Sequence, residues 1–131
     1  MRSAESYAQR SISIGTVIGL AEKDVLGAIE IAAGPLGGFE VADTCMHNFL
    51  LQIAGPHPFR DRVWRDLGFS DGAAALRSLG PAGVASALFD ACGGKPKGLP
   101  KLGLLLWSLK ALIGLLPVRP RDEWEAEAEP D

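Results

Sequence analysis

The chain has 131 residues, which is enough for one domain whose core needs no disulfide or metal. Hydrophobic residues make up 47% and charged residues 22%, which is close to the average for folded domains and argues against general disorder. The net charge is −3, but residues 122–131 hold six acidic residues and no basic one. The thirteen basic and ten acidic residues of 1–121 therefore leave about +3 there, too little for a nucleic-acid-binding domain.

The first segment shows two competing periodicities. Ser11 to Ile14 alternates polar and apolar residues as a strand does, whereas Gly15 and Gly19 have the spacing of a close helix-packing face. The sequence offers no second strand, and an unpaired strand would leave its backbone groups without hydrogen-bond partners. We therefore predict a helix here.

Three Gly-Pro steps, at 34–35, 55–56 and 80–81, are typical helix stops, because Gly accepts a left-handed cap and Pro cannot continue the ladder. Apolar residues recur at helical spacing between them. The pattern predicts helices at 21–33, 39–54, 58–67, 71–79 and from Pro81 to about residue 92.

Local signals refine three of these helices. In the second, Val41, Cys45, Phe49 and Ile53 follow at i+4 steps and predict the buried side. In the third, Phe59, Val63 and Leu67 form the apolar side, opposite charged positions. Ser70 has the position of an N-cap for the fourth helix.

The most informative element is the run LGLLLWSLKALIGLL from Leu102 to Leu116. On a helical projection roughly two-thirds of its circumference is apolar, against about one-third for the surface helix of a soluble domain. On the surface of a monomer such a helix would expose a large apolar patch. The residues of this run that we expect to make contacts are Leu104, Leu105, Trp107, Leu109, Lys110, Leu112, Ile113 and Leu116.

Three interpretations of this helix compete. As a membrane span it is too short, at about 22 Å against about 30 Å of hydrocarbon, and Lys110 would lie near its middle. It can be the central helix of the domain. It can also dock onto a partner protein or an anionic membrane surface, to which Lys95, Lys97 and Lys101 just before it would be attracted. The last two interpretations are compatible, because one side can be core and another interface.

Two tryptophans outside this helix are further candidates for contact. Trp64 has Arg60, Arg62 and Arg65 around it, and Trp and Arg are frequent among binding hot spots. Asp61 and Asp66 alternate with these arginines, which favours local pairing over nucleic-acid contact. Trp124 is the single aromatic residue of the acidic tail and would be its anchor.

The residues that carry chemistry form no known motif. Cys45, His47, His57 and Cys92 do not have the paired spacing of a zinc site, and Cys45 and His47 point in different directions on a helix. We expect His47 to pair with Asp43 on an exposed face, and both cysteines to be buried free thiols in a reducing compartment. The glycine-rich segments lack the Ser/Thr and spacing of a phosphate-binding loop. No cofactor and no metal are expected.

The sequence thus predicts an all-α protein, a small bundle of about five to six short helices with a strongly apolar C-terminal helix and an acidic tail. Residues 1–94 would form the helical body, 95–101 a Lys/Pro linker, 102–117 the apolar helix and 118–131 the tail. The expected function is that of a non-catalytic accessory or adaptor subunit of a larger, membrane-associated or soluble assembly. The alternative is a small helical domain that binds an apolar ligand or cofactor.

We expect an intracellular location, soluble or at the membrane periphery. The N-terminal stretch, with Arg2, Arg10 and several serines, leaves an organelle as an option, although Glu5 argues against a transit peptide.

Overall fold

The computed structural model describes residues 8–116, and this part of the chain is entirely helical, with no strand. The prediction of an all-α protein is therefore confirmed for these residues. The elements are, in chain order, α2 (Gln9–Ile18), α3 (Glu22–Leu36), α4 (Phe39–Ala54), α5 (Pro58–Asp66), α6 (Gly72–Ala91), the 3-10 helix η1 (Pro96–Leu102) and α7 (Leu106–Leu115).

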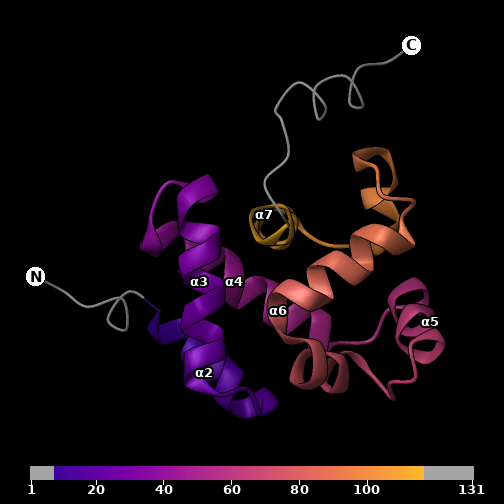
Figure 1. The fold of residues 1–131 in the computed structure, drawn as a ribbon, viewed down its shortest axis with the longest axis horizontal. Coiled ribbons are helices and arrows are strands. Elements are labelled where there is room, and N and C mark those ends of the chain that lie inside the picture. The colour runs from indigo at the N-terminus through magenta and orange to yellow at the C-terminus, as the bar shows by residue number, and fades with distance from the viewer. Residues whose placement is uncertain (1–7, 117–131) are drawn as a thin grey trace, which may run out of the picture.

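Helix α4 is the centre of the arrangement, because it contacts α2, α3, α6 and α7. Figure 1 shows α2 and α3 on one side of the molecule, α5 and α6 on the other, and α7 seen end-on between α3 and α6. The side of α4 that faces these neighbours carries Met46, Phe49 and Leu50, whose side chains are fully buried. Burying each of them stabilises the fold by about 1.5–3 kcal/mol.

The first turn of α2 is capped by a residue from α4. Ala8, at the N-cap position, has no side chain that could accept a hydrogen bond. Instead the Asp43 carboxylate accepts from the backbone N–H of Ser11 at 2.9 Å, and the Ser11 hydroxyl donates to the Asp43 carbonyl at 3.0 Å. The predicted exposed pair of Asp43 with His47 is therefore wrong, since Asp43 is buried and bonded to α2.

Helix α3 continues past the predicted stop at Gly34-Pro35 and ends at Leu36. Pro35 removes only one hydrogen bond this close to the end of the helix, so the last turn tolerates it. The stop is Gly37, which has a φ of 91° and donates its N–H to the carbonyl of Ala33. A left-handed glycine of this kind is a common helix terminator.

The side of α5 that faces the core differs from the prediction. Arg60 and Trp64, one helical turn apart, are buried, while Leu67 is 50% exposed and Phe59 and Val63 are half-buried. The core tolerates the Arg60 guanidinium because this group donates a hydrogen bond to the backbone carbonyl of Gln52. Burial lowers the pKa of Arg60, and the nearby Asp61 carboxylate opposes that shift.

Helix α6 bends at Gly80, whose φ of 74° and ψ of 167° are not helical. The predicted break between a helix ending at 79 and another starting at Pro81 is thus present as a kink. Its N-cap is Asp71 and not the predicted Ser70, because the Asp71 carboxylate accepts from the N–H of Ala74 at 2.8 Å.

The packing at the start of α6 predicts that a single methyl group added at Gly72 lowers the stability of the fold. A Cβ at Gly72 would overlap the backbone carbonyl of Ile53 and lie 3.2 Å from the indole nitrogen of Trp64. We expect Gly72→Ala to lower the free energy of unfolding by about 1–3 kcal/mol, because α4 or α5 must move to accommodate it. Urea unfolding followed by circular dichroism measures this change.

The matched control is Gly27→Ala in α3, where a Cβ would meet no atom within 4 Å. Ala is the better helix former, so this variant should be as stable as the parent or more stable by about 0.5–1 kcal/mol. Equal effects of the two substitutions would contradict the close packing of α6 on α4.

Candidate docking surface

The start of α7 is fixed by α4 and by the loop before α5. The backbone N–H of Leu105, the N-cap residue of α7, donates to the side-chain carbonyl of Gln52 at 2.8 Å. Two residues earlier, Gly103 has a φ of 63°, and a Cβ there would overlap the His57 ring. The chain therefore turns sharply into α7 at a position where only glycine fits.

The structure replaces the predicted helix 102–116 by two elements. Leu102 ends η1, which covers most of the segment predicted as a linker, and α7 begins only at Leu106. Pro100 and the left-handed Gly103 account for the shorter helix, since neither favours a continuous α-helical ladder.

One side of α7 is part of the core. Ser108, Ala111, Leu112 and Leu115 are buried, and α7 contacts both α3 and α4. A Cβ at Gly114 would lie 3.4 Å from the Ala32 Cβ in α3, so the two helices approach closely here. Small residues on both helices allow this close packing.

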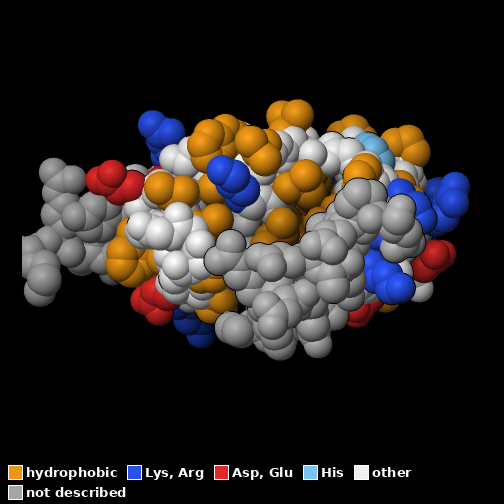
Figure 2. All heavy atoms as spheres, turned by 90° about the horizontal axis from the view of Figure 1, so that it is seen from above, with side chains coloured by type: hydrophobic (Ala, Val, Ile, Leu, Met, Phe, Trp, Pro, Cys, Tyr) orange, Lys and Arg blue, Asp and Glu red, His pale blue; other side chains and the backbone are white. Residues whose placement is uncertain are grey.

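The other side of α7 is exposed to solvent. Leu105 is 66% exposed, Leu106 62%, Trp107 45% and Ile113 41%, and Lys110 is exposed among them. At 3.6 residues per turn the four helical members of this set span about 120° of the circumference. We call these five residues the α7 face. Figure 2 looks onto the molecule from above the view of Figure 1 and shows hydrophobic side chains over much of this side, with basic side chains among them.

Lys110 and Trp107 order each other on this surface. The Lys110 ammonium lies 4.9 Å from the centroid of the Trp107 ring, which is the geometry of a cation–π contact. Such a contact at an exposed site is worth about 0.5–1 kcal/mol. It favours this position of the indole by a factor of about two to five, although almost half of the Trp107 surface faces water.

The α7 face lies in a stretch of the sequence in which every charged residue is basic. Residues 91–121 contain six basic residues and no acidic one. Among them Lys95, Lys97, Lys101 and Lys110 lie in the described part of the chain, and all four are exposed. In Figure 2 further basic side chains lie toward the end of the molecule that carries α5 and η1.

The structure divides the predicted contact residues into two groups. Leu105, Trp107, Lys110 and Ile113 lie on the α7 face, and Leu109 beside them is half-buried. The others that are described are buried and offer a partner no surface, namely Trp64, Leu104, Leu112 and Leu116. Trp124 lies outside the described residues.

Trp64 is a correction to the sequence analysis, because its side chain is completely buried between α4, α5 and α6. The arginines around it cannot form a rim of an interface centred on it. Conversely, the predicted set omits Leu106, one of the most exposed leucines of the chain. Its spacing of seven residues from Ile113 places both on one side of a helix that begins at 106.

The two cysteines are buried free thiols, and His57 caps a helix. Burial raises the pKa of both Cys45 and Cys92, and the charges of Lys110 and Lys101 only partly oppose this. His57 is the N-cap of α5, where its Nδ1 accepts from the N–H of Arg60 at 3.4 Å. Within residues 8–116 no three His, Cys, Asp or Glu residues lie where they could hold a metal ion together.

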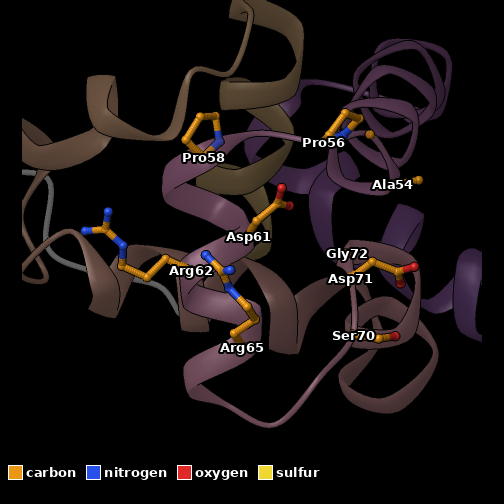
Figure 3. Close-up of a pocket in the computed structure, with 10 residues that line it drawn as sticks. Ala54, Pro56, Pro58, Asp61, Arg62, Arg65, Ser70, Asp71 and Gly72 are labelled. Carbon is orange, nitrogen blue, oxygen red and sulfur yellow. The ribbon is translucent and has the colours of Figure 1, made fainter.

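A second surface feature is a cleft of about 440 Å³ between α5 and the start of α6. In Figure 3 Asp61, Arg62 and Arg65 extend from α5, with Ser70 and Asp71 across from them and Arg62 pointing away. The cleft is lined by two acidic and two basic side chains, so it favours neither sign of charge. It gives no reason to prefer an anionic or a cationic ligand.

Over residues 8–116 the protein is entirely helical, and α7 has an exposed apolar face. No family model, curated protein or solved structure matches the chain. In the described part of the chain no single helix has the length and hydropathy of a membrane span, and α3 with α4 reaches them only as a pair bent by 118°.

The raised thiol pKa values predict that neither cysteine acts as a nucleophile in the native protein. At pH 8 we expect iodoacetamide to modify Cys45 and Cys92 slowly, and both rapidly once guanidinium has unfolded the chain. Mass spectrometry of the intact protein counts the modifications. Rapid native modification of either residue would contradict this prediction and indicate a reactive thiolate.

The same shift has a consequence for stability. Thiols in the unfolded chain ionise near pH 8.5, whereas the native ones ionise only at higher pH. The native state therefore binds more protons above that pH, and the free energy of unfolding should fall as the pH rises through it.

Proposed function

We propose that the protein is a non-catalytic accessory subunit that docks onto a larger assembly through the α7 face. The observation that carries this proposal is the exposure of Leu105, Leu106, Trp107 and Ile113 on one side of a helix whose other side is core. Contiguous apolar surface of this kind on a small domain is typical of an interaction site.

The exposed apolar side chains of the α7 face would supply part of the free energy of binding. Each of the four apolar side chains has about half of its surface in water, so burying all four would contribute roughly 4 kcal/mol. That is a factor of about a thousand in the dissociation constant. Trp107 is the natural centre of the contact, because tryptophan is enriched among hot spots and Lys110 already orders its ring.

The test is the size of the particle that contains the full chain in extracts of its native cells from which the membranes have not been removed. We expect size-exclusion chromatography to find the tagged protein in a complex larger than the 13.8 kDa monomer. Leu106→Glu should return it to the size of a monomer, because a charge replaces an apolar contact. Circular dichroism of the purified variant should match the parent, since Leu106 is mostly in water already.

The control for this test is Leu67→Glu at the end of α5. Leu67 is 50% exposed, against 62% for Leu106, and Figure 1 shows α5 at the right of the molecule, away from α7. This variant should leave the complex intact. The proposal is wrong if the parent chain is a monomer in the extract, or if both variants disrupt the complex equally.

A second candidate function is the binding of a small apolar ligand in the groove between α2 and α4. The groove has a volume of about 430 Å³ and is lined by Arg10, Ser13, Ile14, Val17 and His47, with Gln9 at its end. The observation in its favour is the apolar part of this lining, since Val17 is 81% exposed and Ile14 beside it is half-buried. A lipid found by mass spectrometry in the purified protein, and lost in Ile14→Asp, would support this second function.

A further inference from the structure

We propose that the surface on which the α7 face docks is an anionic phospholipid bilayer. This inference rests on the proposed function, because it names the partner of the same site. It is carried by two observations, the apolar and aromatic side chains of the α7 face and the exposed lysines that precede it in the sequence or lie within it.

The chemistry of the α7 face matches the interfacial region of a bilayer. Leu105 and Leu106 are the most exposed residues of this face and would enter the boundary between headgroups and acyl chains. Trp107 has an apolar ring system with one polar N–H, and such side chains favour the membrane–water interface. Lys110 can keep its ammonium at the headgroups while its stem follows the apolar surface.

The charge around the α7 face argues for an anionic surface and against a second copy of this chain. Lys110 lies within the α7 face and Lys101 four residues before Leu105. Lys97 is on η1 with Lys101, and Lys95 is the N-cap residue of η1. Two such faces brought together would place like charges side by side. An anionic lipid surface attracts all four lysines, each by about a factor of five in affinity.

The depth of contact is limited by the geometry of α7. The helix has ten residues, so it is about 15 Å long and covers only half of the hydrocarbon thickness. Its opposite side is packed on α3 and α4, which leaves the helix lying along the surface and not across the bilayer. The proposed contact is therefore peripheral and reversible, with the fold retained.

The experiment is the cosedimentation of the purified full chain with vesicles. One set is phosphatidylcholine alone, and the other is phosphatidylcholine mixed with phosphatidylserine. We expect binding to the second set only, and weaker binding at high ionic strength, because salt screens exposed charges beyond about 8 Å already at 0.15 M.

Four variants identify the surface that binds. Leu106→Glu should lower vesicle affinity at least tenfold, and Lys110→Gln about fivefold. Leu67→Glu is the apolar control, because Leu67 is 50% exposed at the end of α5. Lys23→Gln is the charge control, because Lys23 is exposed at the end of α3 remote from Ala32, which meets α7. Both controls should bind as the parent does.

Three outcomes would overturn the proposal: no binding to phosphatidylserine vesicles, equal binding to both sets, or binding that Leu106→Glu leaves unchanged. The extract experiment separates this failure from that of the proposed function. If the chain ignores vesicles but enters a large complex that depends on Leu106, its partner is a protein, and only the membrane inference is lost.

Discussion

The close packing of α7 on α3 and α4 is the constraint on which the functional surface depends. The helices approach closely because Ala32, Ala111 and Gly114 are small. The Leu112 side chain is then fully buried in the core. Because the small residues are on one side, α7 has one rotation that packs well. That rotation places Trp107 and its neighbours outside, so core packing on one side fixes what the other side presents.

Several buried or half-buried polar groups of the body join one helix to the next. Asp43 caps α2, His57 caps α5, and Arg60 reaches a backbone carbonyl of α4. These hydrogen bonds hold the helices in fixed positions relative to one another. A small body held rigid in this way is well suited to present one helix face, because docking then costs little conformational entropy.

The sequence predicted helix positions better than helix orientation. The bounds 39–54 of α4 and the start of α5 at Pro58 were readable because Gly-Pro and Pro signals act locally. The buried side of α5 could not be predicted. Phe59 and Val63 form one apolar side and Trp64 lies on another, and only the neighbouring helices determine which of the two is covered. The α7 face was half predicted for the same reason. An almost wholly apolar helix does not reveal which side meets α3, so Leu112 and Leu116 were indistinguishable from Leu105.

Gln52, in the last turn of α4, forms hydrogen bonds to two other elements of the fold. Its backbone carbonyl accepts from Arg60 of α5, and its side-chain carbonyl accepts from Leu105 at the start of α7. One residue thus fixes two elements that have no hydrogen bond to each other among those described. A displacement of Leu105 would stretch its bond to the Gln52 side chain, and the backbone of Gln52 also holds Arg60. Gln52 is thus one link between the docking surface and α5, the helix that lines the cleft.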